Sequence, residues 1–186
     1  MLVVLCAAGC HHDDTKATTM KYLPTAQLVT EIEKADTTPR SGTITSYPIP
    51  VVRDHQLLIA VFQTTAGYDP QARGSVLSPP ERVTFFDPST GVRVNEEPRP
   101  GGPPLGTEPF DVPRTEYRQL SAQLFGAYDV LLPAFAQGLA MTDPVVQNAA
   151  RTFKKLFPRF SGKLLDPYYK EIGEDWVAWI DRTAGA

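Results

Sequence analysis

The chain of 186 residues contains few of the side chains on which many enzymes and small secreted folds depend. It has two cysteines and three histidines, which leaves little material for disulfide, zinc or thiol chemistry. It also lacks an excess of positive charge, because 18 Lys and Arg residues face 21 Asp and Glu residues and give a net charge of −3. This balance excludes a generally basic nucleic-acid-binding protein. Apolar residues make up 42% and charged residues 21%, which also excludes a highly charged disordered chain.

The first ten residues carry a pattern typical of protein export. An apolar run over residues 2–8 ends in small residues, and Ala7, Ala8 and Gly9 directly precede Cys10. This pattern resembles the lipobox of a bacterial lipoprotein signal peptide, in which small residues precede a cysteine that becomes lipidated. No Lys or Arg precedes the run, although secretory signals begin with a positively charged segment. We therefore expect the natural start codon to lie upstream of Met1.

The resemblance implies a signal peptide over residues 1–9 and a lipidated tether over residues 10–20. The remaining residues, 21–186, are expected to form a single α+β domain, a fold class that rests on their strand and helix patterns. Acyl chains such as palmitate on Cys10 would attach the protein to a membrane, in the bacterial cell envelope and facing the periplasm. His11 at the second mature position is not the aspartate that resembles an inner-membrane retention signal, which favours the outer membrane. The alternative is a buried strand over residues 2–5 followed by a loop.

The sequence of the first half of the domain predicts one helix followed by a small antiparallel sheet. Proline at residue 24 suits the first turn of a helix over residues 24–35, and strands are expected between residues 43 and 97. The segment 56–65 is apolar on both faces, so it should be a central strand covered on both sides. Residues 69–80 are expected to form a polar loop. The hairpin signal is clearest where strands over residues 82–86 and 92–94 flank the turn 87–91.

The second half predicts helices after a proline-rich bridge over residues 98–113. Proline fixes φ and has no N–H donor, so neither a helix nor a central strand is expected in the bridge. Its P-x-x-P match at residues 100–103 could be a docking ligand, but an extended connector is the simpler interpretation. Helical spacing of apolar residues then runs to Pro133, from Asp143 to about Pro158, and again from Asp166. Strands followed by helices indicate an α+β fold.

Few residue clusters in the sequence suggest catalysis. Arg53-Asp54-His55 could carry out acid–base chemistry with the single histidine of the domain, but these residue types favour a hairpin turn. The pairs Glu96-Glu97 and Glu108…Asp111 could act as paired carboxylates, although solvated loop acids are the ordinary interpretation. His11-His12-Asp13-Asp14 could chelate a metal ion, but a hydrophilic spacer is more consistent with a tether. We therefore assign no catalytic residue and expect neither a metal nor a cofactor.

The sequence also contains a basic segment without acidic residues near the C-terminus. Its five cations could form an interaction patch for anionic lipid head groups, an anionic envelope polymer or an acidic partner; they are Arg151, Lys154, Lys155, Arg159 and Lys163. The alternatives are the solvated side of an amphipathic helix, or neutralisation by Glu171, Glu174 and Asp175 of the last helix. Trp176 and Trp179, with Tyr168 and Tyr169, could line a ligand pocket, but their helical spacing favours the core.

Together these features favour a lipid-anchored envelope protein with a non-enzymatic binding or assembly role. Its expected partners are the membrane, through Cys10, and an envelope protein or anionic envelope component; nucleic acid is not expected. The first alternative is a carboxylate-dependent hydrolase or a small-ligand-binding protein using His55. The second is a periplasmic inhibitor or immunity protein that inserts a protruding loop, residues 67–80 or 98–113, into its target.

Overall fold

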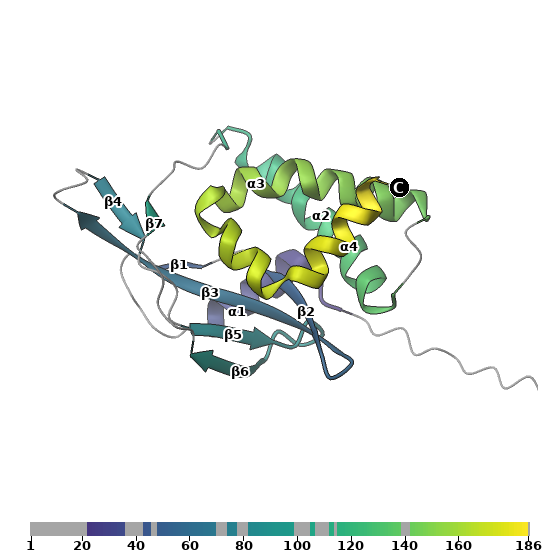
Figure 1. The fold of residues 1–186 in the computed structure, drawn as a ribbon, viewed down its shortest axis with the longest axis horizontal. Coiled ribbons are helices and arrows are strands. Elements are labelled where there is room, and N and C mark those ends of the chain that lie inside the picture. The colour runs from purple at the N-terminus through teal and green to yellow at the C-terminus, as the bar shows by residue number, and fades with distance from the viewer. Residues whose placement is uncertain are drawn as a thin grey trace, which may run out of the picture.

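A computed structural model shows an α+β architecture, as the sequence predicts (Figure 1). It describes residues 22–35, 43–45, 48–69, 74–77, 82–98, 105–106, 112–113, 115–138 and 142–185, and the side chains of these residues except 43–45, 62–69, 74–77, 105–106 and 161–170. The elements in chain order are α1 (Thr25–Ala35), β1 (Thr43–Thr45), β2 (Ile49–Arg53), β3 (Gln56–Asp69), β4 (Gly74–Leu77), β5 (Arg82–Phe86), β6 (Arg93–Pro98), β7 (Leu105–Gly106), α2 (Tyr117–Ala136), α3 (Pro144–Ile172) and α4 (Glu174–Gly185).

The sheet is built around the long strand β3, and every pairing is antiparallel. Strands β2 and β5 lie on opposite edges of β3, because both pair with Ile59 and Ala60, and β6 pairs with β5. The farther half of β3 pairs with β1 and β4, and β7 pairs with β4. Successive residues of β3 point to opposite faces, yet all five side chains from Leu57 to Val61 are buried. The prediction of a central strand covered on both sides is confirmed for these residues.

Both hairpin turns form where turn residues stand in the sequence. Asp54 and His55 adopt φ values of 49° and 63° between the paired residues Arg53 and Gln56, which is the left-handed geometry that a two-residue hairpin requires. The second turn joins β5 to β6. There the N–H of Gly91 donates to the Asp87 carbonyl at 2.8 Å, and Gly91 adopts a φ of 70°. The predicted turns are therefore confirmed.

The boundaries of several elements differ from the sequence prediction. The segment predicted as a polar loop, residues 69–80, contains β4, because the apolar pair Val76-Leu77 can complete a ladder with β3 between the flanking prolines. The bridge contains the two-residue strand β7, which pairs with β4 alone and agrees with the prediction that no central strand forms there. Residues 98, 112 and 113 of the bridge are also described, but the P-x-x-P match lies outside the described residues.

Proline ends fewer helices than the sequence predicts. Helix α2 continues through Pro133 to Ala136, and α3 runs without a break through Pro158 and through the expected restart at residue 166. The predicted helix ends at Pro133 and Pro158 are therefore wrong. A proline inside a helix removes one backbone hydrogen bond, and packing of the remaining apolar face outweighs that loss. The last helix begins only at Glu174, after Gly173.

The start of α3 forms as the sequence predicts, with an aspartate cap before a proline. The Asp143 carboxylate accepts the backbone N–H of Val145 at 2.7 Å and that of Val146 at 3.4 Å. Asp143→Ala would remove this acceptor from the helix end, and we expect the free energy of unfolding to fall by about 1 kcal/mol. Urea denaturation followed by circular dichroism measures the loss. Asp143→Asn, which keeps an acceptor oxygen, should lose less, and equal losses in the two variants would contradict the capping role.

Helix α1 is attached to both the sheet and the helices by specific hydrogen bonds. The backbone N–H and the hydroxyl of Thr25 both donate to the Asp129 carboxylate of α2 at 2.6 Å. The carboxylate satisfies the free N–H of Thr25 at the start of α1 and interacts favourably with the helix dipole. Just before the helix, the N–H of Leu23 donates to the Pro88 carbonyl in the β5–β6 turn at 2.9 Å. These contacts connect α1 to both layers of the molecule.

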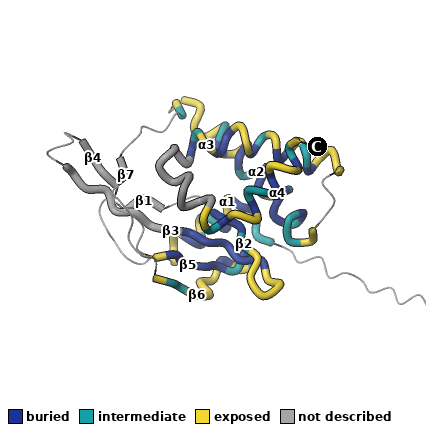
Figure 2. The backbone as a smooth tube through the Cα atoms, viewed as in Figure 1, coloured by how far each residue is buried: buried dark blue, intermediate teal, exposed yellow. Residues whose placement is uncertain are grey.

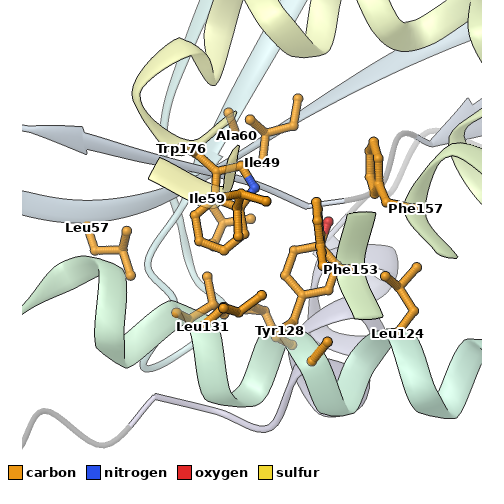
Figure 3. Close-up of a cluster of buried hydrophobic side chains, with 14 of the residues drawn as sticks. Ile49, Leu57, Ile59, Ala60, Leu124, Tyr128, Leu131, Phe153, Phe157 and Trp176 are labelled. Carbon is orange, nitrogen blue, oxygen red and sulfur yellow. The ribbon is translucent and has the colours of Figure 1, made fainter. Parts of the chain in front are cut away.

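The hydrophobic core is concentrated where the helices meet β2 and β3 (Figure 3). Trp176 of α4 is fully buried, and its ring lies 5.6 Å from the ring of Phe153 in α3 and 6.2 Å from that of Tyr128 in α2. The hydroxyl of Tyr128 donates to the carbonyl of Pro48, just before β2, at 2.8 Å. This bond satisfies the polar end of a buried aromatic side chain and connects the helices to the sheet.

Candidate functional site

The cluster Arg53-Asp54-His55 forms a surface hairpin turn. The side chains of Asp54 and His55 are exposed at its tip. The guanidinium of Arg53 lies 4.1 Å from the centre of the Phe85 ring and pairs with Glu97. This geometry is a cation–π contact combined with a surface ion pair. The structure therefore supports the turn interpretation of this cluster, and it places His55 in solvent.

Adjacent acids in β6 point to opposite faces of the sheet. Glu97 pairs with Arg53, whereas Glu96 pairs with Arg82 and with Arg93, the latter at 2.7 Å. Because the two carboxylates diverge and are each held by arginine, they do not form the converging pair that hydrolysis of a glycosidic bond requires. The other candidate acids, Glu108 and Asp111, lie outside the described residues, as does His11-His12-Asp13-Asp14. Within the described part of the chain, no cluster of three or more His, Cys, Asp or Glu side chains could hold a metal ion.

Three cations of the basic segment, Arg151, Lys154 and Lys155, are exposed on α3, along which Figure 2 shows exposed and buried residues alternating. Lys154 pairs with Asp181 of α4 at 2.8 Å, so α4 neutralises part of the segment through a different acid from the three that the sequence suggested. Arg159 also has an interaction partner. The side chain of Lys163 lies outside the described ones. Arg151 and Lys155 are exposed, and neither forms an ion pair with a residue that the structure describes.

The aromatic residues of the last helix belong to the core. Trp176 and Trp179 are both buried, with 7% of Trp179 exposed. Their rings lie 5.7 Å apart, and both pack against Phe135 of α2. The core interpretation is therefore confirmed for the two tryptophans, while the side chains of Tyr168 and Tyr169 lie outside the described set.

A groove between α2 and α3 is a candidate site in the described structure. Its volume is about 300 Å³. The lining combines apolar side chains with uncharged hydrogen-bonding side chains and comes equally from the two helices: Gln123, Gly126, Ala127 and Val130 from α2, and Val145, Asn148, Ala149 and Thr152 from α3. Such a lining suits noncovalent binding, because its amides and hydroxyl can donate and accept hydrogen bonds beside an apolar floor.

Small side chains create the groove. Gly126 stands in the middle of α2, and a Cβ added there would meet no atom within 4 Å. Ala127 and Ala149 are buried beside it. This groove was not predicted from the sequence. The one sequence signal is Gly126 itself, a glycine inside a segment with strong helical spacing. The residues of α3 that face it depend on how the two helices pack, which the sequence does not show.

Comparisons with known proteins add no assignment. Neither family models nor curated protein sequences nor solved structures gave a match to this chain. The described helices include none that is both long enough and apolar enough to cross a membrane. The N-terminal sequence pattern and the α2–α3 groove are therefore the two features that bear on function.

Proposed function

We propose that this chain is an exported, lipid-anchored protein of the bacterial cell envelope with a non-enzymatic binding or assembly role. The observation that carries the proposal is the N-terminal pattern, in which Ala7, Ala8 and Gly9 precede Cys10 after an apolar run. A polar segment separates Cys10 from the first described residue, Tyr22. Acylation of Cys10 would keep the domain at a membrane surface, facing the periplasm, where binding to a partner is confined to that surface.

The α2–α3 groove supports a binding role for the folded domain. Its lining consists of apolar, amide and hydroxyl side chains, which can bind a partner through apolar contacts and hydrogen bonds without covalent chemistry. Val145, at one end of the groove, is 64% exposed, and covering an apolar side chain of this kind on association is favourable. The groove therefore provides a defined surface on which an envelope component could assemble.

Lipidation at Cys10 gives a direct test of the anchoring part of the proposal. When the chain is expressed with an upstream export signal in a bacterium, we expect mass spectrometry of the membrane fraction to show a mature protein that begins at acylated Cys10. Cys10→Ser should give no acylated mature protein that begins at residue 10, because the serine hydroxyl does not replace the thiol in this modification. Cys6→Ser is the matched control and should leave the protein in the membrane fraction. Recovery of a protein that still carries residues 1–9 before an unmodified Cys10 would contradict the proposal.

A further inference from the structure

The α2–α3 groove is long enough to accommodate two turns of a third helix. The two helices run antiparallel. Tyr117 near the start of α2 contacts Phe160 of α3 with ring centres 5.6 Å apart, whereas Tyr128, farther along α2, contacts the earlier Phe153 of α3 at 5.1 Å. The α2 part of the lining extends from Gln123 to Val130, which spans about 10 Å, or two helical turns. Helices that dock in grooves use anchors at i, i+3 or i+4, and i+7, which cover the same length.

The floor of the groove permits close approach of another backbone. Gly126 has no side chain, and Ala127 and Ala149 each have one methyl group. Helices pack with their axes 8–10 Å apart, depending on the side chains at the contact, so small residues on the floor favour a helix over a bulkier element. A small molecule is usually enclosed on most of its surface, whereas this groove lies open between two helices. Its shape therefore fits a helical segment better than a compact ligand.

The rim of the groove carries positive charge toward one end. One side of α3 carries three polar residues at spacings of four and three positions, namely Asn148, Thr152 and Lys155. Lys155 thus continues the polar rim one turn beyond the lining, and Arg151 lies one turn before it on the outward side. Both are exposed and form no ion pair with a described residue, unlike Lys154, which Asp181 neutralises. No residue of the lining is charged, so Arg151 and Lys155 determine the electrostatic preference of the groove. An occupant with acidic side chains at this end is therefore complementary to the site.

We infer that the α2–α3 groove docks an amphipathic helix of a partner protein, with apolar side chains on the floor and acidic side chains facing Arg151 and Lys155. This inference rests on the binding role in the proposed function, and it is independent of lipidation at Cys10. Apolar contact along the floor supplies affinity, and the two cations set the orientation and the charge preference of the bound helix.

Two designed peptides serve as probes of this site. Each has about 16 residues, enough to form a helix on binding, with alanine and leucine at i, i+3, i+4 and i+7. The first carries glutamates at the flanking positions, and its twin carries lysines there. Fluorescence anisotropy with the full chain at low ionic strength measures both affinities. We expect the acidic peptide to bind about tenfold more tightly than the basic twin, because two exposed cations face its glutamates.

Three variants separate the groove from general surface charge. Gly126→Leu fills the groove, and we expect it to weaken binding of the acidic peptide at least tenfold. Gly185→Leu is the matched control, because a Cβ added there in α4 also meets no atom within 4 Å, and it should bind like the unchanged protein. The double variant Arg151→Glu with Lys155→Glu should reverse the preference and bind the basic twin more tightly. Circular dichroism confirms that each variant retains its helices.

Each result of this experiment supports or overturns the docking site. Equal affinities for the two peptides, or unchanged binding by Gly126→Leu, would overturn it. Vesicles of phosphatidylglycerol provide a further arm. If the vesicles bind the protein through Arg151 and Lys155 while Gly126→Leu has no effect, the basic surface contacts a membrane and the helix site is wrong. The result at Cys10 is read separately, so failed lipidation with successful peptide binding would overturn only the anchoring part of the proposed function.

Discussion

Replacing Trp176 with alanine is expected to lower the free energy of unfolding by about 3–5 kcal/mol. The side chain is fully buried and stands where three helices meet. Its ring packs edge-on against Phe135 at 5.2 Å and against Phe153 at 5.6 Å, and it stacks on Tyr128 at 6.2 Å. Truncation leaves a cavity among rigid aromatic rings that cannot collapse to fill it, so the loss should fall in the upper part of the range for core substitutions.

Urea denaturation followed by far-ultraviolet circular dichroism is the suitable measurement for Trp176→Ala. Tryptophan fluorescence is unsuitable, because the substitution removes one of the two tryptophans in the chain. Val145→Ala is the control, since Val145 is 64% exposed and its truncation should change stability by no more than about 0.5 kcal/mol. A loss below about 2 kcal/mol for Trp176→Ala would contradict the central position of this ring in the core.

The second large effect is expected for Gly91→Ala in the β5–β6 turn, with a loss of about 2–4 kcal/mol. Two causes combine at this position. The φ of 70° lies in the left-handed region that disfavours alanine. An added Cβ would also lie 2.6 Å from the Cβ of Glu31 in α1. The contact is with the root of the Glu31 side chain, so a rotamer change cannot relieve it, and α1 or the turn must shift.

Two further variants separate these causes. Gly138→Ala carries the backbone cost alone, because Gly138 has a φ of 59° and an added Cβ there meets no atom within 4 Å; its loss should be about 1 kcal/mol. Glu31→Gly removes the clashing Cβ. In a double-mutant cycle, Glu31→Gly combined with Gly91→Ala should lose less stability than the sum of the two single variants. Strictly additive losses of stability would show that there is no steric clash between α1 and the turn in Gly91→Ala.

The sequence predicts this fold best where the signal is local. The residues that start α3 are adjacent in the chain, and Asp143 caps the helix as expected. The tight turn at Asp54 and His55 is likewise determined by neighbouring residues. Prediction failed where distant packing decides the outcome. Proline disfavours helix at Pro133 and Pro158, but burial of the surrounding apolar faces of α2 and α3 outweighs this local preference.

The candidate site was beyond sequence reasoning for the same physical reason. A groove is a property of two surfaces, and its α2 and α3 walls are contributed by segments about 20 residues apart whose pairing is fixed only in the fold. The basic segment was visible in the sequence, because its residues are neighbours. The sequence does not show which of its cations are neutralised, since the pairing of Lys154 with Asp181 depends on how α4 packs against α3.

The attachment of α1 has a mechanical consequence if the proposed lipid anchor at Cys10 holds the protein by its N-terminus. A pull transmitted along the chain before Tyr22 reaches Leu23 and Thr25 first. Leu23 is bonded to the β5–β6 turn, and Thr25 is bonded twice to Asp129 of α2. The strain is therefore divided between the sheet and the helical layer at the point where it enters the domain. In the proposed anchored state, a pull on the tether would therefore reach the α2–α3 groove through Asp129, which stands next to the lining residue Val130.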